Sequence, residues 1–474
     1  MKGLKKVAIL IAGVLSVGAI GALAACTPKE PQAEKHDPVA MTASRAYAVV
    51  QGYEWGPAVP KVVVEFPENA SGFVDDTFAV SFTTQGWGGP QKTKRTVKSA
   101  YSSDANGVKT TAASKFVTVE MTVKYNECSP FVYNNMNNWA ESIDFTVTVN
   151  KDKSFKVGST TYLGGDYFTY SAKAADRKVP QTASWHKDTV THEGITLQRA
   201  SWAPDGAATD SGKNPLIIWL HGAGEGGTDI DIDLLGNEVT ALTTENETNV
   251  QKYFAKDGLA GAYVLAVQTP TMWMDRGDGQ YNQDGEGKQE SKYTAALYNA
   301  ITTYVDGNSD IDTDRIYIGG CSNGGYMTMN MMFEHGDYFA AYYPICEAYM
   351  NSRISDDMIA QVKDYNIWFL QSENDGTVNP TATTVPTYYR LLEAGAKNCW
   401  FTFTEKVLGT DDPDAKGWTG ALGYDGHWSW IYAFNDQVTT RFDTSKVTSQ
   451  DYLTSANCTV ENVNLWSWMA AQSK

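Results

Sequence analysis

The stretch RIYIGGCSNGGYMTM, residues 315–329, begins like a strand and ends like a helix. Residues 315–318 are largely apolar and β-prone, whereas residues 326–332 contain no glycine or proline and suit a helix. Ser322 lies at the turn between them, with glycines on both sides. A strand–turn–helix of the form G-x-S-x-G is a nucleophile elbow when it lifts the serine hydroxyl above a sheet. The alternative is a glycine turn without chemistry, at which two backbones approach closely.

A nucleophile elbow requires a histidine later in the chain, and only six histidines are present. Five of them lie near the N-terminus, at the junction of the two halves of the chain, in the loop HGAGEGG, or just behind the elbow helix. His427, in GYDGHWSW, follows a glycine-rich loop near the C-terminus and is free to reach the top of a sheet. It is therefore the predicted general base, and a structural histidine bonded to a backbone carbonyl is the alternative.

The acid of such a site is expected between Ser322 and His427, on a loop after a strand. The segment NIWFLQSENDGTVNP supplies Asp375, which directly precedes a Gly-Thr-Val-Asn-Pro turn. Glu373 is the alternative acid, and a simple turn aspartate is the alternative role for Asp375. The order Ser…Asp…His is that of the α/β hydrolases.

The loop LHGAGEGG, residues 220–227, follows the apolar strand predicted at 216–220. Its small residues allow backbone N–H groups to turn toward a developing negative charge, as an oxyanion hole requires. A phosphate-binding loop is excluded because no Gly-Lys-Ser/Thr follows. Four features in the required order, each at the end of a strand, predict a serine hydrolase.

The two halves of the chain differ in their hydrophobic pattern. With 474 residues, two domains are expected. Residues 42–185 carry short alternating runs between Gly, Asn, Asp and Ser clusters, which predict an antiparallel β-sandwich. Residues 186–474 alternate apolar strands with helical stretches, which predict a mostly parallel sheet flanked by helices. The methionine-rich segment 327–332 is predicted to be core.

The N-terminus indicates export. Three lysines precede an uncharged apolar run that ends LAAC, which predicts a secretory signal peptide over residues 1–25. Its cleavage site resembles a lipobox, and this resemblance implies that Cys26 is lipid-modified. Residues 26–41 are polar and proline-rich, as a tether should be. The expected location is the extracellular face of a bacterial membrane, by a lipid anchor, or the medium; a spanning helix is the alternative.

The region from about 190 to 440 resembles secreted esterases of the α/β-hydrolase superfamily. WLHGAGEGG, GGCSNGGYMTM, NDGTV and GHWSW carry the resemblance, which is to the prolyl-oligopeptidase-like, feruloyl-esterase and polyhydroxybutyrate-depolymerase-like branch. Some bacterial esterases of this group carry an N-terminal immunoglobulin-like domain, and residues 42–185 resemble such a domain. The resemblance implies a catalytic triad and two backbone N–H donors of an oxyanion hole: Ser322, Asp375 and His427, with Ala223 and Asn323. Where the family has a stretch close to His-Gly before the acid, this chain has Gln371-Ser372.

The predicted activity is ester hydrolysis through an acyl-enzyme, without cofactor or metal, on acetyl or feruloyl esters of plant polysaccharide. A prolyl-oligopeptidase-type peptidase is one alternative, although the N-terminal half shows no blade-length repeat. A non-catalytic, carbohydrate-binding lipoprotein is the other. The formal net charge of −17 argues against nucleic acid or anionic lipid as a binding partner.

Three further segments carry weaker predictions. Residues 269–287, with Trp273, are either a substrate-facing loop or a long solvated excursion. The asparagine-rich segment 134–139 is predicted as a plain loop, with a sugar-binding surface as the alternative. Cys321 and Cys346 each follow an apolar run; they form a disulfide or pack as small buried hydrophobes.

Overall fold

The computed structural model describes residues 36–86, 89–244, 249–279, 287–417 and 420–474. The predicted signal peptide, Cys26 and most of the predicted tether lie outside these described residues. Residues Pro38–Lys474 form one contiguous unit. None of the helices in the described part of the chain is both long and apolar enough to cross a membrane.

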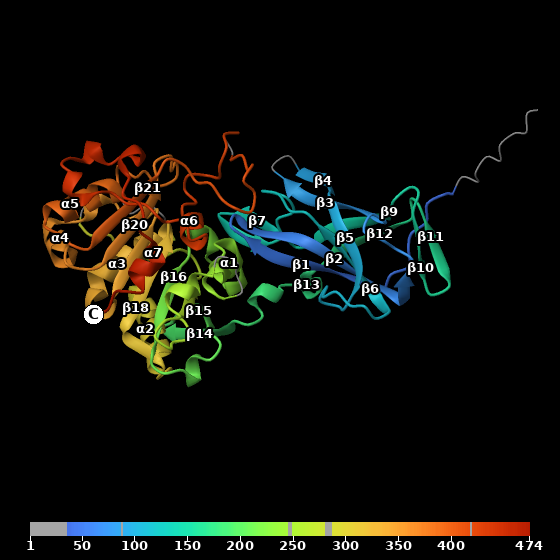
Figure 1. Cartoon of the computed structure of the whole chain (residues 1–474), viewed down its shortest axis with the longest axis horizontal. Helices are drawn as coiled ribbons and strands as arrows, with labels where there is room; N and C mark the ends of the chain where they lie inside the picture. Colours follow the sequence, from blue (N-terminus) through green and yellow to red (C-terminus); the bar gives the residue numbers. More distant parts are fainter. Residues whose placement is uncertain (1–35, 87–88, 245–248, 280–286, 418–419) are drawn as a thin grey trace, which may run out of the picture. The chain divides into compact units, whose positions relative to one another are not determined.

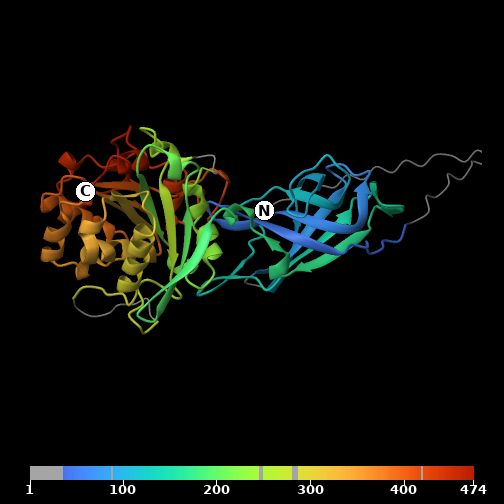
Figure 2. The ribbon, with the colours of Figure 1, turned by 90° about the horizontal axis from the view of Figure 1, so that it is seen from below.

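The N-terminal part of this unit is built from strands (Figures 1 and 2). They are β1 (Arg45–Tyr53), β2 (Gly56–Ser71), β3 (Phe78–Gly86), β4 (Gly89–Arg95), β5 (Val97–Ser103), β6 (Ser114–Met121), β7 (Phe131–Asn134), β8 (Met136–Trp139), β9 (Ile143–Val149), β10 (Ser154–Val157), β11 (Thr160–Leu163), β12 (Tyr167–Ala172) and β13 (Arg177–Lys178). One sheet has the order β11-β10-β2-β1-β13, with β6 beside β2 and β5 beside β6; the other is β12-β9-β3-β4. In β9 every second residue is buried, as expected for a strand with one face in a core. The predicted immunoglobulin-like β domain is confirmed.

A separate sheet of eight strands forms the C-terminal part. Its strands are β14 (His186–His192), β15 (Ile195–Trp202), β16 (Asn214–Leu220), β17 (Tyr263–Gln268), β18 (Ile311–Cys321), β19 (Ala341–Ile345), β20 (Ile367–Ser372) and β21 (Cys399–Thr404). The order is β14-β15-β17-β16-β18-β19-β20-β21. The pairs β14–β15 and β15–β17 are antiparallel, and all later pairs are parallel. The predicted α/β-hydrolase sheet is therefore confirmed.

Helices cover both faces of this sheet (Figure 2). They are α1 (Ile230–Gly236), α2 (Thr294–Asp306), α3 (Asn323–His335), α4 (Asp356–Val362), α5 (Thr384–Glu393), α6 (Trp430–Phe434) and α7 (Leu465–Met469). Leu216 and Ile218 of β16 pack in the cluster that contains α2 to α5, whereas Ile217 and Trp219 pack in the cluster of α1, α6 and α7. Because both faces are buried, the central strands read as continuous apolar runs.

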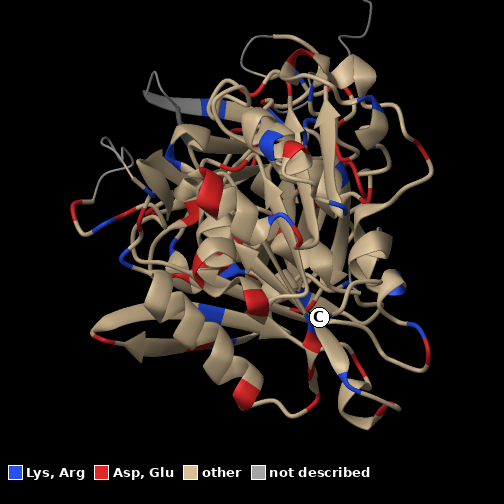
Figure 3. Cartoon of the chain, turned by 90° about the vertical axis from the view of Figure 1, so that its left-hand side faces the viewer, with Lys and Arg blue, Asp and Glu red and all other residues tan. Residues whose placement is uncertain are grey.

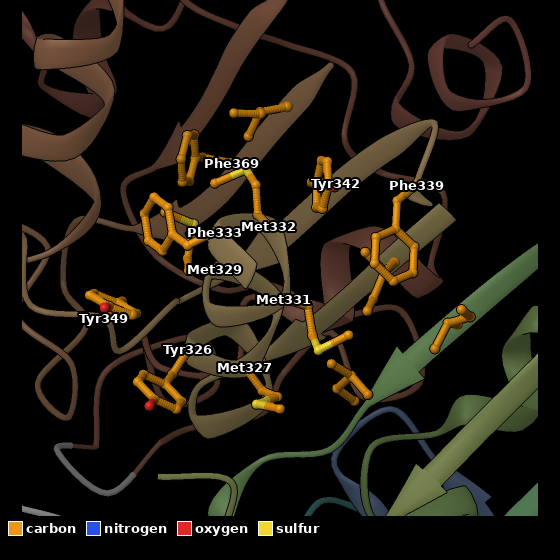
Figure 4. Close-up of a cluster of buried hydrophobic side chains, with 14 of the residues drawn as sticks. Tyr326, Met327, Met329, Met331, Met332, Phe333, Phe339, Tyr342, Tyr349 and Phe369 are labelled. Atoms are coloured by element: carbon orange, nitrogen blue, oxygen red, sulfur yellow. The ribbon is translucent and has the colours of Figure 1, made fainter. Parts of the chain in front are cut away.

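The methionines of α3 lie in the core, as predicted. Met327, Met329, Met331 and Met332 are completely buried. Figure 4 shows them around α3, among aromatic rings such as Tyr342. The helix behind the elbow is therefore held by apolar packing and offers no methionine surface to a ligand.

The cysteines adopt one of the two predicted states. Cys321 and Cys346 are both completely buried and unpaired, and the other three described cysteines are also buried and free. The two thiols lie in the same apolar cluster, beside β18 and β19. They pack as small hydrophobes, and the alternative disulfide is not formed.

Acidic and basic side chains are interspersed on the face shown in Figure 3. The formal net charge of −17 is therefore not collected there in one acidic patch. Charges of mixed sign produce weaker long-range fields than a patch of one sign.

Candidate active site

Ser322 occupies the turn between β18 and α3, in a backbone conformation that few side chains adopt. Its φ is 57° and its ψ is −114°, and it is half-buried. The glycines make the turn possible, because a β-carbon on Gly320 or Gly324 would overlap the carbonyl oxygen of Leu220 in β16. A non-glycine residue held at positive φ is a strained conformation of the kind found at nucleophile elbows.

His427 and Asp375 are in direct contact. The imidazole Nδ1 lies 2.9 Å from Oδ2 and 3.0 Å from Oδ1 of Asp375. Both side chains are buried, and Oδ1 also accepts hydrogen bonds of 2.9 Å from the backbone N–H groups of Thr377 and Val378. The backbone of the Asp-Gly-Thr-Val turn therefore holds the carboxylate in place, and the imidazole of His427 contacts both oxygens of the same carboxylate.

Glu373, the alternative acid, is directed elsewhere. Its carboxylate accepts hydrogen bonds from the backbone N–H and the hydroxyl of Ser455. Of the two candidate acids, the structure brings Asp375 to His427. Gln371, at the departure from the family pattern, donates to Asp375 Oδ2 at 3.2 Å and so supports the carboxylate.

Sequence reasoning missed Cys346 beside this pair. Its thiol, the Asp375 carboxylate and a ring nitrogen of His427 lie within 4.8 Å of one another. Burial lowers the pKa of His427, but Cys346 and Asp375 outweigh it, so the pKa is raised above its ordinary value. The three ligand-type atoms are the best candidate for a metal among the described residues, yet both carboxylate oxygens already accept hydrogen bonds from His427. The sequence did contain a signal for a position near the site. Cys346 directly follows β19, just as Ser322 directly follows β18.

The predicted oxyanion loop is rigidly supported by its own histidine. The His221 Nε2 accepts a 3.0 Å hydrogen bond from the Thr269 N–H, so Nδ1 carries the proton and donates to Gly222 O at 2.6 Å. Burial lowers the pKa of His221 to about 4. This histidine is therefore neutral near pH 7 and serves as a structural link between the ends of β16 and β17.

Ala223 and Asn323, the predicted oxyanion donors, belong to two segments that follow neighbouring strands, β16 and β18. Ala223 is half-buried and begins the short 3₁₀ helix η4 (Ala223–Glu225). Asn323 is the first residue of α3, where N–H groups lack partners within the helix. Its side-chain Oδ1 accepts a 3.3 Å hydrogen bond from the backbone of Met274.

Trp273 does not have the predicted position. The side chain is completely buried, 5.2 Å from the ring of His221 and 6.1 Å from that of Tyr293 between centroids. Since the ring packs behind the oxyanion loop, it cannot serve as a platform for substrate. Residues 280–286 of the same segment lie outside the described residues.

The asparagine-rich segment 134–139 is not a plain loop, contrary to the prediction. It belongs to the hairpin β7–β8, which pairs Phe131 with Trp139. Asn137 Nδ2 donates to Glu225 Oε1 at 3.0 Å, and the Trp139 indole donates to Asp229 Oδ2 at 2.8 Å. Polar strands without apolar alternation give no strand signal in sequence, and here the amides bind protein groups.

Two family models match parts of the chain. Residues 45–163 match the esterase Ig-like N-terminal domain, and residues 274–388 match the prolyl oligopeptidase family. No curated protein matches the sequence.

Several solved structures are similar to the chain. A thermostable esterase is 23% identical over 90% of this chain and 99% of its own, with a TM-score of 0.63. A ferulic acid esterase is 15% identical over 52% of this chain and 93% of its own, with a TM-score of 0.36. Est1E from Butyrivibrio proteoclasticus is 15% identical over 46% of this chain and 87% of its own, with a TM-score of 0.29. The chain has an α/β-hydrolase fold preceded by an immunoglobulin-like domain.

Proposed function

We propose that this protein is a serine hydrolase of the carboxylesterase type, with Ser322 as nucleophile, His427 as base and Asp375 as the orienting acid. One observation carries the proposal: the His427–Asp375 hydrogen bond lies at the edge of the sheet where β18 ends in the strained turn of Ser322. Parallel strands bring their carboxyl ends to the same edge, which is where α/β enzymes act.

The reaction follows from these groups. His427 takes the hydroxyl proton of Ser322 as its oxygen attacks the ester carbonyl. The tetrahedral oxyanion accepts hydrogen bonds from the backbone of Ala223 and Asn323, donors that typically contribute about 3 kcal/mol each. The alcohol leaves with the proton from His427, and water then releases the acid by the same steps. Asp375 holds the imidazole tautomer and stabilises its charged form.

The substrate class belongs to the same proposal. Acetyl and feruloyl esters on plant polysaccharide are the first compounds to test. Lipid attachment through Cys26 would place the enzyme at the outer face of a bacterial membrane, where such polymers are accessible.

A peptidase is the second candidate, because residues 274–388 match the prolyl oligopeptidase family. Ester hydrolysis and peptide hydrolysis would use the same triad. The leaving group is an alcohol in the first and an amine in the second. The chain has a β-sandwich where propeller-bearing peptidases carry blade repeats, which favours the esterase.

The deciding experiment compares p-nitrophenyl acetate and butyrate with proline-linked p-nitroanilides. Wild type should hydrolyse the esters and react once with a fluorophosphonate, and Ser322→Ala should lose both properties while remaining folded. Faster cleavage of the anilides would favour the peptidase. Labelling that persists in Ser322→Ala would reject the nucleophile.

A further inference from the structure

A buried glutamate lies directly behind the oxyanion loop. Glu225 is the last residue of η4 and is 7% exposed. A β-carbon placed on Gly222 would lie 3.0 Å from Glu225 Oε2 and 3.8 Å from the β-carbon of Ser322. The carboxyl of Glu225 and the nucleophile therefore both contact Gly222, the residue that precedes Ala223.

Hydrogen bonds tie this carboxyl to two segments. Asn137 of β8 donates to Oε1 at 3.0 Å, and the side chain of Asn237, just after α1, also bonds to the carboxyl. Asn237 Oδ1 in turn accepts from the Gly222 N–H at 3.4 Å. Because a β-carbon on Gly236 would come within 2.7 Å of Glu225 Cγ, α1 must end in glycine for the side chain to fit. The loop geometry thus depends on Glu225.

The surroundings of Glu225 disfavour a negative charge. Asp233 of α1 is completely buried, and the Trp219 indole is the one side-chain donor near its carboxyl among the described residues. The Cys321 thiol lies near both acids; the hydrogen bonds from Asn137 and Asn237, and more weakly the charge of His427, favour ionisation of Glu225, but burial outweighs them. No ion pair between described residues involves Glu225 or Asp233. Burial raises the pKa of Glu225 to about 7, and that of Asp233 well above its usual range.

We propose that Glu225 is a positioning residue that holds the oxyanion loop and performs this role as an uncharged acid. The inference rests on the proposed ester hydrolysis. If Glu225 ionised, it would add a negative charge behind the loop that must stabilise the oxyanion. A unit charge ~7 Å from the oxyanion, at an effective dielectric constant of ~20–40, changes a rate by roughly 10- to 50-fold.

The pH dependence follows from the direction of the pKa shift. A carboxyl with a raised pKa is uncharged below that pKa and ionises as the pH rises through it, so its support is lost above about pH 7. His427 acts in the opposite direction, because the base must be unprotonated. Since both enzymes carry His427, the ratio of kcat/KM between a Glu225 variant and wild type removes its contribution, except for the small change in the pKa of His427 that the charge of Glu225 itself causes.

The experiment measures kcat and KM for p-nitrophenyl acetate between pH 5.5 and 9 in wild type, Glu225→Gln and Asp233→Asn. Glutamine is a permanently uncharged copy of the acid. The Glu225→Gln to wild-type ratio should be close to one at low pH and rise about tenfold or more above pH 7, mainly through kcat. Asp233→Asn changes the neighbouring carboxyl without touching the loop, and its ratio should stay flat. Glu141→Gln, with a side chain 96% exposed, is the surface control.

Three outcomes would overturn the inference: a flat ratio for Glu225→Gln, a rising ratio for Asp233→Asn in its place, or a flat ratio for Asn137→Ala. Asn137→Ala removes a donor that favours the charged carboxylate, so its ratio to wild type should rise above pH 7, and it keeps the test open even if Glu225→Gln does not fold. Wild type that neither hydrolyses p-nitrophenyl esters nor reacts with a fluorophosphonate would refute the proposed function, and this inference with it. Ester hydrolysis with a flat ratio refutes only the role of Glu225.

Discussion

Replacing Asp375 by asparagine tests the proposed triad at its most specific contact. The carboxylate accepts from His427 Nδ1, from two backbone N–H groups and from Gln371. An asparagine can keep its oxygen on the backbone donors, which then turns its NH₂ group toward the imidazole. Nδ1 must accept that hydrogen bond, so the proton moves to Nε2 and the base can no longer take a proton from Ser322.

The expected loss in turnover is about four orders of magnitude, the size found for the equivalent change in a serine protease triad. This corresponds to about 5.5 kcal/mol of transition-state stabilisation, at 1.36 kcal/mol per tenfold. Stability should change far less. Gln371 loses one acceptor but still donates to Val378 O at 2.9 Å, so the cost is about 1 kcal/mol.

The assay is single-turnover release of p-nitrophenol together with a thermal melt. Glu373→Gln is the matched control, because its carboxylate bonds Ser455 and not the histidine; it should retain activity. The double variant shows whether Glu373 partly replaces Asp375 in the single one. An inactive Glu373→Gln beside an active Asp375→Asn would mean that the acid is Glu373, and the reasoning from geometry would fail.

Three other predictions can be tested with less effort. Gly324→Ala should destabilise the fold by at least about 2 kcal/mol and abolish activity, because its β-carbon would overlap Leu220 O; an unchanged melting temperature would contradict this. Since the pKa of His427 is raised, kcat/KM should fall with decreasing pH through a value above about 6.5, and a midpoint below 6 would refute the raised pKa. Cys26→Ser should move the protein from the membrane to the soluble fraction, or leave it unprocessed, in detergent partitioning; unchanged membrane association would reject the lipid anchor.

The sequence predicted those parts of the molecule that local pattern determines. The elbow at Ser322 could be predicted because its glycines are its neighbours in the sequence. The structure gives the reason for these glycines, since the backbone of β16 leaves no room for a β-carbon. The fold class followed from two hydrophobic patterns: alternation of apolar and polar residues in strands such as β9, and continuous apolar runs in strands such as β16. Asp375 was preferred over Glu373 because it directly precedes a turn. In the structure it is Asp375 that bonds to His427.

The errors at Trp273 and Asn137 have the same physical cause. Whether a side chain of a loop is buried depends on segments that are distant in the sequence. Trp273 was one candidate for contact with substrate because its segment follows a strand and is polar further on, yet the ring is completely buried and packs near His221. The asparagines near Asn137 read as a loop because their partner, Glu225, is 88 residues away. No periodicity within either segment encodes such a partner.

Cys346 and Glu225 show the same effect of distant segments at the proposed active site. Both residues contact groups of the proposed machinery, and both resemble ordinary positions in sequence, a small residue after a strand and an acid in a glycine loop. The chemistry of Glu225 changes because its surroundings are dry: a buried carboxyl is held in its uncharged form unless a specific partner stabilises the charge. His427 has such a partner in Asp375, whereas Glu225 faces another acid. The same edge of the sheet thus stabilises positive charge at the base and disfavours negative charge behind the oxyanion loop, which is the electrostatic arrangement that a tetrahedral oxyanion requires.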